Sequence, residues 1–187
     1  MAMRADAKTY KKMYDRIPQV IQDKVVLEIA TGPGLLAKNV AHAAKKMIAT
    51  DYSEGMIKQA LKSDNPPNLT FKITDATNLQ YEDNSFDVVL IANALHIIPN
   101  PEKALQEIDR VLRPDGTLIA PTFVNHQEGF GSKLWSGILK IAGVRFEHQW
   151  SPNEFADFLV RNGWQITHNE VLHSRISMDY IECVRAK

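Results

Sequence analysis

The stretch EIATGPGLLA, residues 28–37, decides the fold. It joins the apolar run VVL to a segment with helical spacing, so a glycine-rich turn connects a buried strand to a helix. Such a turn lets a ligand approach the backbone closely, because side chains at Gly32 and Gly34 would occupy its space. The stretch fits two motifs. From Gly32 it reads G-x-G-x-x-A, which is typical of dinucleotide sites, and from Glu28 it reads acid-x-small-x-Gly-x-Gly, which is typical of a different cofactor.

Two residues of the turn favour the second motif. A dinucleotide site holds a pyrophosphate with backbone amides and a helix N-terminus. Here Pro33 removes one amide, and Glu28 adds an anion at the end of the strand. A carboxylate repels a pyrophosphate but attracts an ammonium group. The turn therefore indicates a ligand with a cationic end.

Outward from this turn, strand-like and helix-like segments alternate from residue 24 to about residue 124. Such alternation predicts a parallel sheet with helices on both faces. The expected strands are 24–30, 46–51, 69–75, 86–93 and 117–124, and two last strands, WQITHNEVL and SRISMDYIECVRA, are expected to form a hairpin-like pair. The expected helices are 34–44, one capped by Ser53, one with Asn100 as cap and Pro101 at its first position, and one with a Ser151–Glu154 capping box that ends before Gly163.

The composition is that of one ordinary globular domain. The 187 residues are 44% hydrophobic and 24% charged, and Lys plus Arg equals Asp plus Glu at 22 each. The balance gives no strong field toward nucleic acid or an anionic membrane, so neither is an expected partner. The lone Cys183 cannot form an internal disulfide, and the N-terminus lacks the apolar core of a signal peptide, which predicts a reducing, cytoplasmic setting. The histidines show no metal-ligand spacing, so no metal is expected.

Acids also follow the second and third expected strands. Asp51 lies about 20 residues beyond Gly32, the distance at which an acid can accept hydrogen bonds from both ribose hydroxyls. Asp75 is followed by the small Ala76, so it could pair with an adenine amine while the ring lies flat. Three acids at the ends of adjacent parallel strands suit a molecule that combines an amino acid with adenosine.

With these motifs in order, the sequence resembles a class I S-adenosylmethionine-dependent methyltransferase that acts on a small molecule. The resemblance rests on EIATGPG, IATDYSEGM and the run from ITDATNLQ to RPDGTLI, and Ala30 stands where the family usually has its first glycine. It implies a Rossmann-like, doubly wound α/β fold with seven strands, mostly parallel with an antiparallel last strand, and S-adenosylmethionine as cofactor. The cofactor-binding residues it implies run from the methionyl end to the adenine: Glu28, Ala30, Thr31, Gly32, Gly34, Asn93 and Ala94, then Asp51, Tyr52, Met56, Asp75, Ala76 and Thr77.

The whole of 1–187 is expected to be one such domain, with residues 1–23 as a helical cap and residues 125–150 as an insertion over the acceptor site. A general base would help an oxygen or nitrogen acceptor, and His96 and His126 are the candidates that the loops permit. Aromatic residues of the cap and insertion are expected to contact the acceptor: Tyr10, Tyr14, Phe123, Phe130, Trp135 and Trp150. The methyl acceptor, the oligomeric state and any partner that completes the cap stay open.

Several alternatives stay open as well. Glu28 could pair with a lysine, Asp51 could only stabilise the following helix, Asp75 could only form a turn, and His96 could pack in the core. A non-catalytic S-adenosylmethionine-binding module fits the same motifs. A nicotinamide-dependent oxidoreductase shares the glycine motif but is opposed by Glu28, by Pro33 and by the absence of Tyr-x-x-x-Lys.

Overall fold

The computed structural model describes residues 7–124, 148–173 and 177–186. The helices are α1 (Ala7–Ile21), α2 (Leu35–Val40), η2 (Ala41–Ala43), α3 (Glu54–Ala60), η3 (Leu95–Ile97), α4 (Pro101–Val111) and α6 (Pro152–Arg161). The strands are β1 (Val25–Ile29), β2 (Lys46–Asp51), β3 (Leu69–Ile73), β4 (Phe86–Ile91), β5 (Leu112–Ile119), β6 (Thr122–Phe123), β7 (Trp164–Leu172) and β8 (Met178–Arg185). Among the described segments, every helix is too short or too polar to span a lipid bilayer.

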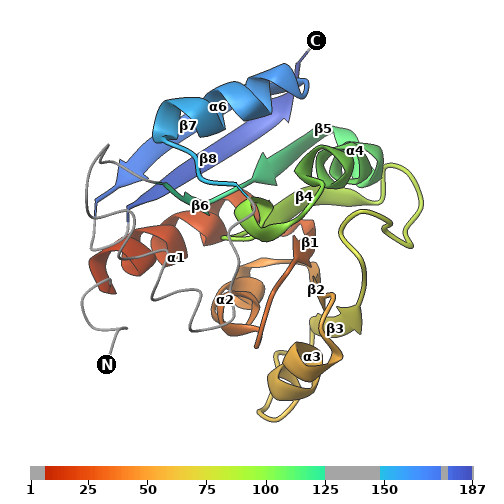
Figure 1. The fold of residues 1–187 in the computed structure, drawn as a ribbon. Helices are drawn as coiled ribbons and strands as arrows, with labels where there is room; N and C mark the ends of the chain where they lie inside the picture. The colour runs from red at the N-terminus through yellow and green to blue at the C-terminus, as the bar shows by residue number, and fades with distance from the viewer. Residues whose placement is uncertain (1–6, 125–147, 174–176, 187) are drawn as a thin grey trace.

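A single mixed sheet organises the chain (Figure 1). Its strands follow the order β3-β2-β1-β4-β5-β8-β6, and β7 pairs with β8. β1 to β5 pair in parallel, and β8 runs antiparallel to β5, β6 and β7. The predicted doubly wound α/β sheet with an antiparallel last strand is therefore confirmed, and an eighth strand, the two-residue β6, joins the seven expected.

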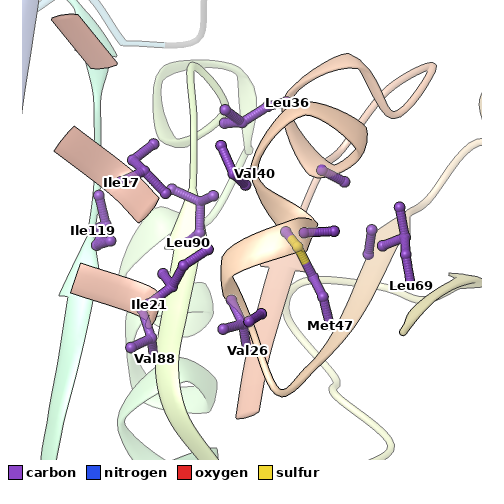
Figure 2. Packing of buried hydrophobic residues seen from close by; sticks show 14 of the residues in the cluster. Ile17, Ile21, Val26, Leu36, Val40, Met47, Leu69, Val88, Leu90 and Ile119 are labelled. Atoms are coloured by element: carbon purple, nitrogen blue, oxygen red, sulfur yellow. The ribbon is translucent and has the colours of Figure 1, made fainter. Parts of the chain in front are cut away.

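Helices cover both faces of this sheet and bury two separate clusters of apolar residues. α1, α2 and α3 pack on one face, and α4 and α6 pack on the other. Alternation along the strands supplies both clusters, as Val26 and Leu27 of β1 show by pointing to opposite faces. In Figure 2, Ile17 and Ile21 of α1 lie against β4 and β5 residues of the first cluster, so α1 is part of the core.

Three helices, α3, α4 and α6, begin where side-chain capping predicts. The Ser53 side chain accepts a hydrogen bond from the Met56 amide, and Asn100 accepts one from the Lys103 amide. Ser151 forms the complete capping box with Glu154. Gly163 follows the end of α6 with φ 85°, a left-handed conformation that glycine adopts without strain.

Most expected strands are shorter in the structure by one or two residues at an end, and two expected elements differ more. The expected helix 34–44 is split into α2 and the short helix η2. The expected strand 117–124 begins earlier, at Leu112, and is interrupted before β6 by Ala120 and Pro121. Proline has no amide hydrogen to donate to a neighbouring strand, so the break falls where the pairing shifts from β5 to β6.

Candidate active site

The loop between β1 and α2 has a strongly bent backbone. Ala30, Gly32 and Gly34 all have positive φ, at 57°, 58° and 78°. A Cβ atom added at Gly32 would meet nothing within 4 Å, so the backbone there is open to a ligand. A Cβ atom at Gly34 would lie 2.6 Å from the Phe71 ring. The expectation that both glycines make room for a ligand therefore fits Gly32 only, because Gly34 makes room for an aromatic ring of β3.

Glu28 lies beneath this loop. Its side chain is only 2% exposed, and its Oε2 atom accepts a hydrogen bond of 2.7 Å from the Thr31 hydroxyl. Burial raises the pKa of Glu28 to about 7, and the charge of Asp51 adds to the rise. Glu28 is thus a covered carboxyl close to its ionisation point, and a cation placed over the loop would favour its charged form.

Asp51 connects the loop to the end of β2. Its Oδ2 atom accepts from the Gly32 amide and its Oδ1 atom from the Ser53 amide, both at 2.8 Å. These two bonds fix the carboxylate and leave each oxygen with a further lone pair. Asp51 therefore orders the start of α3, as the structural alternative held, and can still accept hydrogen bonds from a pair of hydroxyls.

Apolar side chains lie exposed beside Asp51. Tyr52 is 77% exposed and Met56 is 45% exposed, although both are large. Asp75 follows β3, the neighbouring strand, and its Oδ1 atom accepts from both the amide and the hydroxyl of Thr77. Asp75 thus forms the turn that the structural alternative described, and its Oδ2 atom is engaged by none of these bonds. Ala76, which lies between Asp75 and Thr77 in the sequence, is half-buried and packs against the core.

The order of strands reverses between β1 and β4, and Asn93 follows β4 at this point. Its φ is 52°, and its amide donates a 2.7 Å hydrogen bond to the Pro121 carbonyl. Its side-chain Oδ1 atom is buried without a hydrogen-bond partner. The next residue, Ala94, is buried. In open α/β sheets, ligands bind outside the carboxyl ends of the strands where the order reverses, so Asn93 lies where a ligand is expected.

His96 is buried in η3 and contacts Phe123 of β6, with the two ring centroids 5.9 Å apart. Burial, and then the nearby His148, lowers the pKa of His96 to about 4. The imidazole is therefore neutral at pH 7 and a weak base, whereas a general base works best with a pKa near the operating pH. Its role as a base stays a prediction.

The other predicted acceptor residues occupy different environments. Trp150 stacks on His148 and on Phe158 of α6, so most of its ring serves the second core cluster. Tyr14 of α1 packs against the first cluster, where burial and then the Glu28 carboxyl raise its pKa. His126, Phe130, Trp135 and the Tyr10 side chain lie outside the described residues.

Comparison with known proteins identifies the family. A model of the methyltransferase domain matches residues 27–120, which is half of the chain. The chain belongs to the methyltransferase domain family. The resemblance to class I S-adenosylmethionine-dependent methyltransferases is confirmed with it.

Relatives of this methyltransferase domain match a part of the chain. A demethylmenaquinone methyltransferase of Paenarthrobacter aurescens is 39% identical over 98 residues, which are 52% of this chain and 38% of that protein. A ubiquinone/menaquinone biosynthesis C-methyltransferase of Rickettsia akari is 34% identical over 125 residues, 62% of this chain and 50% of that protein. The match thus spans half or less of these relatives' length.

A solved structure matches the fold over the whole methyltransferase. It is a chain from the complex of the Haloferax volcanii Trm112 methyltransferase activator with a putative methyltransferase. It aligns with a TM-score of 0.81 at 17% identity and covers 100% of this chain and 92% of its own. At this identity the likeness concerns the fold alone.

The residues of this methyltransferase fit S-adenosylmethionine. The open space over Gly32 leaves room for an aminoacyl group, and the unpartnered Asn93 Oδ1 can accept a hydrogen bond from an ammonium group. The fixed carboxylate of Asp51 can accept from ribose hydroxyls, and the exposed Tyr52 and Met56 offer apolar surface to a flat ring. In the described part of the chain, no group of three His, Cys, Asp or Glu side chains could hold a metal ion.

The sequence-based reasoning missed two buried acids of β8. Glu182 accepts two hydrogen bonds from the Arg16 guanidinium and one from the Tyr180 hydroxyl, which ties α1 to the sheet. Asp179 is fully buried, opposite Thr122 of β6. The signal was two acids in the otherwise apolar strand MDYIECV, three positions apart and so on opposite faces.

Proposed function

We propose that this chain transfers the methyl group of S-adenosylmethionine to a small-molecule acceptor. One observation carries the proposal: the bent loop with open space at Gly32 faces the fixed carboxylate of Asp51, whose Oδ2 atom holds the loop's own amide. An aminoacyl group and a ribose can be bound side by side in that arrangement. When bound, S-adenosylmethionine supplies a methyl group that its sulfonium charge already activates.

The chain's own residues then have to position the cofactor and the acceptor and to keep water away from them. Glu28 adds negative charge under the loop, Asp51 orients the ribose, and Tyr52 with Met56 flanks the adenine. Holding an acceptor in line with the methyl group contributes about 7–11 kcal/mol of the barrier reduction through positioning alone. A site of this kind needs few dedicated catalytic groups.

For the acceptor, we propose a compound with an aromatic hydroxyl, of which a quinol is the example. Relatives named as demethylmenaquinone and ubiquinone/menaquinone methyltransferases support this class through 34–39% identity over the matched segments. Those segments are half or less of the relatives' length. The acceptor of this chain therefore needs its own experiment, which is given below.

Calorimetry with S-adenosylmethionine, S-adenosylhomocysteine, NAD and NADP tests the cofactor. We expect saturable binding of the first two and none of the nicotinamide cofactors. Asp51→Asn should weaken binding by about tenfold, because the amide can accept only part of the ribose hydrogen bonds. Binding of NAD in preference to S-adenosylmethionine would overturn the proposal.

Methyl transfer is tested separately with radiolabelled cofactor and a panel of phenols, naphthols and short-chain quinols. Transfer to the hydroxylated aromatics, and none to matched hydrocarbons, supports the proposed acceptor class. Cofactor binding without transfer to any member of the panel would favour the non-catalytic binding module instead. The matched control for Asp51→Asn is Asp109→Asn, an exposed acid of α4 paired with Arg185.

A further inference from the structure

Three polar side chains at the carboxyl edge of the sheet carry buried oxygen atoms that have no hydrogen-bond partner among the described residues. They are Asn93 after β4, Thr122 of β6 and Asp179 of β8. The Asn93 amide bonds to the carbonyl of Pro121, the residue before Thr122, and Thr122 is the register partner of Asp179. The three residues therefore form one continuous row, which begins with Asn93 at the point where the strand order reverses and ends with Asp179 on β8.

Asp179 is the most unusual of the three. Its side chain is 0% exposed, and neither Oδ1 nor Oδ2 has a hydrogen-bond partner. Its neighbours across the sheet are Thr122 on β6 and Val171 on β7. Burial alone raises the pKa of Asp179 to about 6, so no cation among the described residues compensates its charge.

The same strand carries a contrasting acid. Glu182 is also buried, but Arg16 and Tyr180 bind its carboxylate from the α1 side of the sheet. Asp179 lies on the opposite face, three positions earlier, and shares that face of β8 with Cys183 and with Arg185, which pairs with Asp109 of α4. A buried polar group without a hydrogen-bond partner lowers the stability of the fold. Proteins typically carry such a loss of stability at sites that bind a ligand.

We propose that Asp179 and Thr122 form the acceptor subsite, in which they bind the hydroxyl group of the methyl acceptor. This inference rests on the function proposed above. In the proposed function Asn93 faces the methionyl part of the cofactor, and a hydroxyl held at Thr122 and Asp179 would then lie on the same edge of the sheet as the transferred methyl group. Both acceptor oxygens of Asp179 and the hydroxyl of Thr122 are available for it.

Asp179 also takes the proton in this arrangement. The O–H bond of the acceptor breaks, its proton moves to an Asp179 oxygen, and the electron pair stays on the acceptor. That pair forms the bond to the methyl carbon from oxygen, or through the ring from an adjacent carbon; in the second case this carbon then loses its own proton and the oxygen takes one up, which restores the aromatic hydroxyl. The carbon–sulfur bond breaks with its electron pair on sulfur, and the Asp179 proton returns to solvent after product release. A carboxyl group with a pKa about one unit below neutral is suited to this transfer.

The binding half of the proposal is tested with 1-naphthol and naphthalene as a matched pair of probes, in the presence of S-adenosylhomocysteine. The wild-type protein should bind 1-naphthol at least tenfold more tightly than naphthalene. Asp179→Leu, which keeps the branched side chain but has methyl groups in place of both acceptor oxygens, should abolish this preference, and Thr122→Val should reduce it. Glu182→Gln, on the other face of β8, should keep the preference.

The proton-transfer half is tested with Asp179→Asn. The variant should keep its affinity for S-adenosylhomocysteine within twofold and lose 10²- to 10⁴-fold in single-turnover methyl transfer. A hydroxyl preference that is missing in the wild type, or that survives both Asp179→Leu and Thr122→Val, would overturn the subsite. Failure of the proposed function is a separate result, since it shows as absent cofactor binding before any acceptor is added.

Discussion

Replacing Ala30 with glycine tests the strongly bent backbone of the loop between β1 and α2. Ala30 holds φ 57°, a left-handed conformation that costs an L-residue about 1–2 kcal/mol and costs glycine nothing. Against this gain, glycine gives the unfolded chain more freedom, worth about 0.4–1 kcal/mol. The half-buried methyl group is also lost, worth about 0.4 kcal/mol as half of a buried carbon. The expected net change in the free energy of unfolding lies between a loss of about 0.4 kcal/mol and a gain of about 1.2 kcal/mol.

Ala92 provides the matched control. It directly follows β4 as Ala30 follows β1, it is half-buried against a core cluster, and its φ is not positive. Ala92→Gly loses a similar methyl group and gains the same unfolded-state freedom without any relief of strain. It should therefore destabilise the protein by about 1 kcal/mol, which is about 2–4 °C in Tm at this chain length.

Urea denaturation of both variants measures the difference, which should be about 1–2 kcal/mol in favour of Ala30→Gly. Equal losses in the two variants would refute the strained backbone at residue 30. Cofactor affinity of Ala30→Gly should stay within about twofold of the wild type, because the alanine already holds the backbone that glycine would adopt.

Three further predictions follow from the site and its supports. Gly34→Ala should destabilise the protein by about 2 kcal/mol or more, because the added methyl group meets the ring of Phe71. Gly32→Ala should cost only about 1 kcal/mol of backbone strain but should weaken cofactor binding. Denaturation measures the first effect and calorimetry the second. Cofactor affinity should fall by up to about tenfold per pH unit between about pH 7 and 5.5, because Glu28, whose pKa in the protein without cofactor is about 7, must lose its proton when the cofactor binds. Glu28→Gln should bind the cofactor more weakly and should not show this pH dependence. Arg16→Ala should lower the free energy of unfolding by about 1–3 kcal/mol at pH 7, because it leaves the buried Glu182 carboxylate without its cationic partner. Burial raises the pKa of Glu182, but the hydrogen bonds from Arg16 outweigh this effect and keep it low. The loss of stability should therefore shrink as pH falls below about 4, where Glu182 becomes protonated.

Local chemistry explains what the sequence predicted well. The caps at Ser53, Asn100 and Ser151 are side-chain bonds to amides three residues away, so they can be recognised without knowing the fold. The acid at residue 51 was found because a fixed spacing separates it from the glycine turn.

What the sequence did not reveal depends on register between distant strands. Gly34 is required by a ring of β3, and no spacing rule connects the two positions. Asp179 and Thr122 face each other only because β6 and β8 pair in one particular register. The break at Pro121 produced β6, and the sequence pattern had merged it with the preceding strand.

The two buried acids of β8 show how one strand can serve both stability and function. Glu182 is bound by Arg16, so the face toward α1 gains a connection that fixes the N-terminal helix. Asp179, on the other face, has no such bond and keeps all of its hydrogen-bonding capacity. If the two carboxyl groups exchanged environments, α1 would lose its bond to Glu182, and the carboxyl group at residue 179 would no longer be free to bind a ligand. If Asp179 binds the acceptor, its replacement by leucine should therefore stabilise the fold while it removes the hydroxyl preference, whereas loss of Glu182 should do the opposite.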